Sequence, residues 1–240
     1  MDDITYEVSG AVATLTICRQ HKRNALARKH FARLAALMRR ADEDGSIRVV
    51  VLTGEGSLAF CAGADLSADE TFLEDLASDR TTGLGDYLRQ TCLLPKPRVA
   101  RINGHCYAGG MGLLASCDLV VTCDDARFAL PEINLGIFPF VVLAALEDRI
   151  AHGHAMQLAL SGAAISADRA FEIGLVSHKV PRSELDAAVE TIVAGLAMHS
   201  ASATAFGLLH ARRADTAGYL SRITKAEALS RELASSREGN

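Results

Sequence analysis

Hydrophobic and polar positions alternate near the start of the chain as a half-buried strand requires. In the segment VATLTI, Ala13, Leu15 and Ile17 fall on one face, and the residues between them fall on the other. Ser9 and Gly10 separate this strand from a second one, ITYEV, and predict a turn between the two. Further strands are predicted in five apolar runs: IRVVVLTG (47–54), PRVAR (97–101), LVVTC (119–123), ARFAL (126–130) and LVSHKV (175–180).

Helical spacing of apolar residues appears between and after these strands. Leu26, Phe31, Leu34 and Met38 predict a helix from about 25 to 41, with basic residues on its other face. Further helices are predicted from 109, over 139–150 and 152–161, between the cap Ser166 and Gly174, and in two stripes of the tail, 185–196 and 220–233. Residues 69–93 are polar and mixed, and predict helical pieces around a mobile loop.

The order of these elements predicts the fold class. Strands alternate with helices over the first 180 residues, which favours an α/β fold with parallel strands. The helical tail after the last strand is expected to act as a cover or as an oligomer interface.

The composition of the 240-residue chain is ordinary for a soluble globular protein, with 49% apolar residues, 22% charged residues and a net charge of −4. This balance gives no sign of a nucleic-acid or membrane partner, and an aromatic content of 5% leaves few rings for stacking on bases. The N-terminus lacks a signal-peptide pattern, and the longest apolar run, 135–146, is too short to cross a membrane. We therefore expect a cytoplasmic protein.

The cysteines and histidines do not indicate a metal site. The six cysteines lack the spacing of a zinc knuckle, and we expect reduced, buried, small apolar side chains. A nucleophilic Cys61 or Cys106 has no support in the sequence. The HGH segment at 152–154 fits helix packing better than metal binding.

Two glycine-bearing turns, each after a strand, are the first candidate for chemistry: CAGAD (61–65) and YAGGMG (107–112). The second turn opens a helix, whose first N–H groups lack intrahelical partners. One N–H from each turn could form an oxyanion hole, or the glycines could serve only tight packing. The spacing does not fit the dinucleotide-binding pattern G-x-G-x-x-G.

Glu132 is the second candidate, because it is a lone carboxylate in the apolar stretch ALPEINLGIFPF. Buried there, it would have a raised pKa suited to general acid–base catalysis near neutral pH. The alternative is an exposed loop glutamate after Pro131.

Several segments, in their order and spacing, resemble the crotonase family, the enoyl-CoA hydratase/isomerase superfamily. They are RNAL (23–26), VVVLTGEG (49–56), AFCAGADL (59–66), ARINGHCYAGGMGLLASCDLVV (100–121), ARFALPEINLGIFP (126–139) and ALSGAAISADRAFEIGLVSHKV (159–180). The resemblance implies a spiral of ββα units: a catalytic core binding acyl-CoA over residues 1–181, and a helical oligomerisation region over 182–240. The expected assembly is a trimer or a dimer of trimers.

The resemblance also implies roles for individual residues. The family polarises a thioester carbonyl with two backbone N–H groups, which by motif position belong to Ala64 and Gly109. Lys22 and Arg23 either contact the CoA phosphates or form a solvated pair on the surface. Lys225 of a neighbouring subunit is a further candidate for a basic residue that contacts CoA. Asp65 is expected to bind CoA or to cap the following turn. The implied substrate contacts are Arg23, Ala25, Leu26, Ala62, Asp65, Leu66 and Gly110; no cofactor is implied beyond the CoA of the substrate itself.

One departure from the family pattern bears on the reaction. Family hydratases activate a water with two glutamates; the first would stand at Gly112, and only the second is present, as Glu132. A single carboxylate can move a proton between C2 and C4 of an enoyl thioester, and GIFPF resembles family isomerases. We therefore expect an enoyl-CoA isomerase. A hydratase with another group in the missing role, and a catalytically silent acyl-CoA-binding or RNA-binding protein, stay open.

Overall fold

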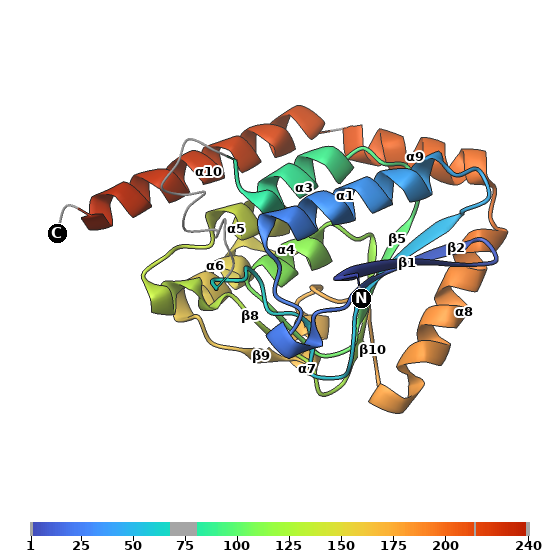
Figure 1. Cartoon of the computed structure of the whole chain (residues 1–240), viewed down its shortest axis with the longest axis horizontal. Helices are drawn as coiled ribbons and strands as arrows, with labels where there is room; N and C mark the ends of the chain where they lie inside the picture. Colours follow the sequence, from blue (N-terminus) through green and yellow to red (C-terminus); the bar gives the residue numbers. More distant parts are fainter. Residues whose placement is uncertain (1, 68–80, 214, 239–240) are drawn as a thin grey trace.

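The computed structural model describes residues 2–67, 81–213 and 215–238 (Figure 1). Residues 69–80 of the stretch 69–93, for which helical pieces around a mobile loop are predicted and which is also expected to line the acyl pocket, lie outside the described residues. Its described end forms a helix, α3 (Gly83–Thr91), whose N-cap Thr82 accepts a hydrogen bond from Gly85 N at 3.0 Å.

A six-stranded sheet forms the first layer, in the order β1-β2-β3-β5-β7-β10. The hairpin predicted at Ser9 and Gly10 is confirmed, because the first two strands pair antiparallel in register. All the other neighbours pair parallel, as the alternation of strands and helices predicts. The strands are β1 (Ile4–Ser9), β2 (Val12–Ile17), β3 (Val49–Gly54), β5 (Arg98–Ile102), β7 (Leu119–Cys123) and β10 (His178–Val180).

A four-stranded sheet, in the order β4-β6-β8-β9, forms a second layer. Its strands are β4 (Ala59–Cys61), β6 (His105–Tyr107), β8 (Arg127–Ala129) and β9 (Ile165–Ser166). The chain visits the two sheets in turn: β3, β5 and β7 lie in the first, and β4, β6 and β8 follow them in the second. This alternation agrees with the predicted spiral of ββα units: β5 and β6 lead into a helix at residue 109, and β7 and β8 lead into a 3-10 turn at residue 131.

Helices pack around these sheets. The predicted helix from 25 begins instead at residue 28, because Leu26 is held in a parallel bridge with Ala64. The helix predicted before Gly174 is confirmed, with the Ser166 hydroxyl accepting from Arg169 N at 3.2 Å. These two helices are α1 (Arg28–Glu43) and α7 (Ala167–Glu172). The other helices besides α3 are α4 (Gly109–Ala115), α5 (Phe140–Leu146), α6 (His152–Ser161), α8 (Leu185–Met198), α9 (Ala201–Arg213) and α10 (Thr216–Glu238), with 3-10 turns η1 (Gln20–Lys22), η2 (Pro131–Leu135) and η3 (Arg182–Glu184).

The helical tail lies against the core of its own chain. Helix α8 packs on β3, β5 and β7 through Leu185, Val189 and Val193, which are buried. Helix α10 runs along α3 and over α5 (Figure 1). The buried carboxylate of Glu227 on α10 accepts from Thr82 N at 2.8 Å and pairs with Arg89. The tail thus acts as a cover, whereas its predicted role in forming trimers stays a prediction.

Among the described residues, no single helix has the length and apolar character of a membrane span. Helices α8 and α9 meet these two criteria only when they are taken together, as a pair bent by 102°. The predicted state of the cysteines is confirmed: all six are free, and four are buried.

Candidate functional site

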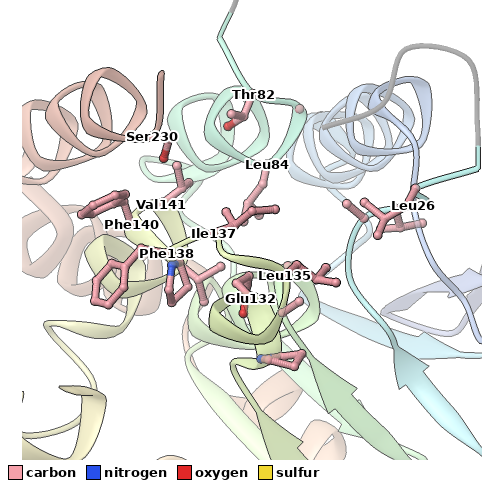
Figure 2. Close-up of a pocket in the computed structure, with 18 of the residues that line it drawn as sticks. Leu26, Thr82, Leu84, Glu132, Leu135, Ile137, Phe138, Phe140, Val141 and Ser230 are labelled. Carbon is pink, nitrogen blue, oxygen red and sulfur yellow. The ribbon is translucent and has the colours of Figure 1, made fainter. Parts of the chain in front are cut away.

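A cavity of about 960 Å³, counting its open mouth, lies between α1, α3, η2, α5 and α10 (Figure 2). Six of the residues predicted from the sequence line it, although they come from four separate segments of the chain. They are Leu26, Ala62, Ala64, Leu66, Gly109 and Glu132.

The backbone N–H groups of Ala64 and Gly109 have no acceptor among the described residues. In the bridge between Leu26 and Ala64, the hydrogen bonds run from Leu26 N to Gly63 O and from Asp65 N to Leu26 O. Such a parallel bridge leaves the N–H of Ala64 itself directed away from Leu26. Gly109 is the first residue of α4, so its N–H lacks an intrahelical partner.

The two turns that carry these amides are in direct contact. Gly63 has a φ of +97°, and a Cβ there would lie 2.6 Å from Ala108 Cβ and 3.1 Å from Gly109 N. Ala108 has a φ of 50° and a ψ of −124°, a conformation that L-residues rarely adopt. This strained residue sets the orientation of the peptide whose N–H belongs to Gly109. The close approach therefore brings two unpartnered donors to one wall of the cavity, as an oxyanion hole requires.

Glu132 lies in η2, and Figure 2 shows its carboxylate at the cavity. Its Oε2 atom is buried and has no hydrogen-bond partner among the described residues. Burial raises the pKa of Glu132 to about 7, because an apolar surrounding disfavours the charged form. The carboxylate can thus both accept and return a proton near neutral pH.

Gly112, the position of the absent glutamate, faces Leu84 of α3. A Cβ at Gly112 would lie 2.7 Å from Leu84 Cδ2 and 3.1 Å from its Cδ1. Leu84 itself lines the cavity (Figure 2). An apolar side chain from another helix therefore occupies the space into which a carboxylate at 112 would project.

The other predicted contacts do not line the cavity. Gly110 lies beneath it, where a Cβ would come 2.4 Å from Cys61 O; glycine lets α4 begin against β4. Arg23 is exposed, and Ala25 is buried beside Leu26. The Asp65 carboxylate is 2.9 Å from Arg19 Nη2 and accepts from Ser67 N at 3.1 Å. Burial acts to raise its pKa, but hydrogen bonds from Ser67 and Arg19 outweigh this and lower it to about 2.

Two basic candidates for CoA lie outside the cavity as well. Lys22 Nζ is 2.6 Å from Ser67 Oγ, on the loop that follows Ala64. Lys225 is exposed on α10.

Much of the cavity wall could not be assigned from the sequence pattern. Phe138, Phe140 and Val141 extend the apolar wall on the far side of Glu132, and Ser230 of α10 closes its upper part (Figure 2). Thr82, at the start of α3, lines the cavity together with Ser230 and belongs to the stretch 69–93, which is expected to line the pocket. The two phenylalanines lie in the segment GIFPF, close to Glu132 in the sequence, and this closeness could have identified them as cavity residues. Ser230 lies nearly a hundred residues later, and no pattern in the sequence around it indicates that it lines the cavity.

The buried thiols do not offer a nucleophile. Burial raises the pKa of Cys61 to about 12 and that of Cys106 well above its usual value. Both thiols therefore stay protonated near neutral pH, whereas a nucleophilic cysteine must be a thiolate.

Comparison with known proteins gives consistent matches. The model of the enoyl-CoA hydratase/isomerase family matches residues 7–233. A short-chain-enoyl-CoA hydratase of Clostridium acetobutylicum is 34% identical over 187 residues, which are 77% of this chain and 71% of that protein. An (E)-benzylidenesuccinyl-CoA hydratase of Thauera aromatica is 35% identical over 189 residues, which are 76% and 71% of the two chains. The crystal structure of an enoyl-CoA hydratase of Mycobacterium smegmatis superposes with a TM-score of 0.79 at 31% identity, covering 92% of this chain and 90% of the other.

Proposed function

The chain belongs to the enoyl-CoA hydratase/isomerase family, and from its cavity we propose that it shifts the double bond of an enoyl-CoA thioester between C3 and C2. The thioester oxygen accepts hydrogen bonds from Ala64 N and Gly109 N. The Glu132 carboxylate is the acid–base group. CoA extends from the cavity along the segments 23–26 and 62–66, with Lys22 and Arg23 close to its phosphates.

One observation supports isomerisation over hydration. Glu132 is the only carboxylate among the described residues that line the cavity, and Leu84 covers the position of the second one. A hydratase must orient a water and exchange its protons, for which the family uses two carboxylates. One carboxylate is sufficient to carry a single proton from carbon to carbon.

The proposed steps balance in protons and electrons. The Glu132 carboxylate takes a proton from C2 of a 3-enoyl thioester, and the C–H electron pair passes into a dienolate whose charge rests on the thioester oxygen. The two amides stabilise this charge, at roughly 3–4 kcal/mol for each well-placed donor. Glu132 then returns the proton to C4, which leaves the double bond between C2 and C3.

The first test follows a 3-enoyl-CoA in the ultraviolet. We expect the absorbance of the conjugated 2-enoyl thioester to appear, with no 3-hydroxyacyl product in the mixture. Conversely, loss of a 2-enoyl-CoA band with formation of a 3-hydroxyacyl-CoA would identify a hydratase, the activity in the names of several relatives. Affinity for acyl-CoA esters without turnover of any of them would identify a silent binding protein.

The pH dependence should follow the state of Glu132. Proton removal from C2 needs the carboxylate, so kcat/KM should be low below pH 6, rise through about pH 7 and level off above it. The rise is placed near 7, and not near 4.5, because burial disfavours the charged carboxylate. Initial rates over pH 5–9 measure the profile. A rate that is flat from pH 5 upward would contradict the raised pKa, and a rate that falls above pH 7 would assign Glu132 as the acid in the first step.

A further inference from the structure

A second cavity, separate from the proposed active site, has a floor rich in arginine. It measures about 1130 Å³ with its open mouth, and lies between the C-terminal halves of α3 and α4, the end of α5, and the helices α9 and α10. Three arginines line it: Arg98, Arg149 and Arg212. The proposed isomerase mechanism uses none of them.

Three aspartates also line the cavity, but only one of them forms an ion pair with these arginines. Asp118 pairs with Arg212, with its two oxygens 2.6 and 2.8 Å from Nη2. At the rim, Asp148, Asp215 and Glu147 all pair with a single guanidinium, that of Arg222. Among the described residues, neither Arg98 nor Arg149 has a carboxylate within ion-pair distance. Asp118 is therefore the one carboxylate, among the described residues, that forms an ion pair with the three arginines of the floor, whereas the rim around Arg222 holds a surplus of carboxylates.

Arg98 is the most unusual member of this group. It is only 5% exposed, although it projects from a central strand, β5. Its Nη1 atom donates to Thr91 O at 3.1 Å, and its Nε atom is buried without a partner among the described residues. A buried guanidinium that lacks a counter-ion is strongly unfavourable, and arginine does not relieve this by losing its proton.

The neighbouring arginines are also held inside by backbone groups. Arg149 donates from Nε to Leu175 O at 2.8 Å and from Nη1 to Cys117 O at 2.7 Å. Burial, and next to it the positive charge of Arg98, lower the pKa of Arg212. Arg98 and Arg212 therefore repel each other across the same space.

We propose that this cavity binds a small oxyanion with two negative charges, of the phosphate class, between Arg98 and Arg149. The planar guanidinium presents paired N–H donors that match phosphate and carboxylate oxygens. Arg98 and Arg149, which form no ion pair among the described residues, would face the two negative charges of such an anion. Tyr219 on α10 lines the same cavity, and its hydroxyl would add a donor from the helix that covers the active site. Binding would thereby hold α9 and α10 against the core.

Inorganic phosphate is the probe for this site. In the full chain, we expect phosphate to raise the unfolding temperature in a saturable way, beyond the effect of sodium chloride at equal ionic strength. Titration calorimetry should give one site per chain. The Arg98→Met variant keeps the apolar stem but loses the charge, and should bind phosphate at least tenfold more weakly. Arg127→Met, which removes an exposed arginine on β8, is the matched control and should bind as the natural chain does.

A second readout separates a binding role from a structural one. Without phosphate, Arg98→Met should unfold at the same or a higher temperature than the natural chain, because the variant no longer buries an unbalanced charge. A large loss of stability in phosphate-free buffer would mean that Arg98 is structural, and would overturn the proposal. Equal phosphate affinity in Arg98→Met and Arg127→Met would overturn it as well.

The anion could also come from a carboxylate of a second copy of the chain. Phosphate binding is therefore measured together with the oligomeric state by sedimentation. Binding to the intact assembly supports the small oxyanion. Binding that appears only after the assembly dissociates would instead assign the cavity to a carboxylate of the neighbouring copy.

Discussion

Replacing Glu132 by glutamine is expected to lower kcat for a 3-enoyl-CoA about a thousandfold, within the roughly 10²–10⁴-fold range of general acid–base catalysis. Glutamine has nearly the same shape but cannot take the proton from C2. The two amides at Ala64 and Gly109 remain, so the acyl-CoA ester should still bind with a Kd within about threefold of the natural value. The rate comes from the growth of the conjugated thioester band, and the Kd from titration calorimetry.

The folding of this variant is a built-in control. The pKa of Glu132 is raised in the folded state, so the folded chain binds the extra proton and loses stability as pH rises from about 4.5 to 7. At pH 8 glutamine removes this cost, and the variant should unfold at the same or a higher urea concentration. Glu190→Gln, at an exposed position on α8, controls for the loss of one carboxylate. Unchanged turnover in Glu132→Gln would remove this residue from the mechanism.

Local patterns were sufficient to predict most of the elements. The alternation in VATLTI places Ala13, Leu15 and Ile17 inside, and all three are fully buried in β2. The hairpin and the capped helix at Ser166 also follow from residues close together in sequence. Short strands were harder to predict: β4 and β6 have three residues each, which is too few for a period to show.

Contacts between distant segments limited the prediction of the site. The glycine turns and Glu132 could be selected because each carries a local signal. Leu84 could not, because nothing in its own segment shows that it packs on Gly112. Arg98 reads as a strand residue that could face solvent, and only the packing of β5 between β3 and β7 buries it. Likewise, the apolar spacing in α10 gives no indication that the carboxylate of Glu227 is buried, because its partners lie on α3.

Substitution of Gly63 by alanine should lower kcat/KM by about two to three orders of magnitude, the cost of losing one oxyanion donor. The new methyl group would lie 2.6 Å from Ala108 Cβ and 3.1 Å from Gly109 N, so the two turns must move apart. Ala64 follows Gly63 directly, and Gly109 follows Ala108. A shift of either turn therefore separates the two N–H groups that must meet at one oxygen atom.

Gly174→Ala separates this effect from ordinary glycine strain. Gly174 also has a positive φ, +77°, but an added Cβ would meet only Arg149 O, at 3.9 Å. Gly174→Ala should lose roughly 1–2 kcal/mol of stability, because an L-residue is strained in this conformation. Gly63→Ala should lose at least as much, because its methyl group also forces the two turns apart. Only Gly63→Ala should lose activity, and it should do so for every acyl chain tested, because the thioester oxygen is common to all of them. Equal kcat/KM in the two variants would show that the contact between the turns does not position the donors.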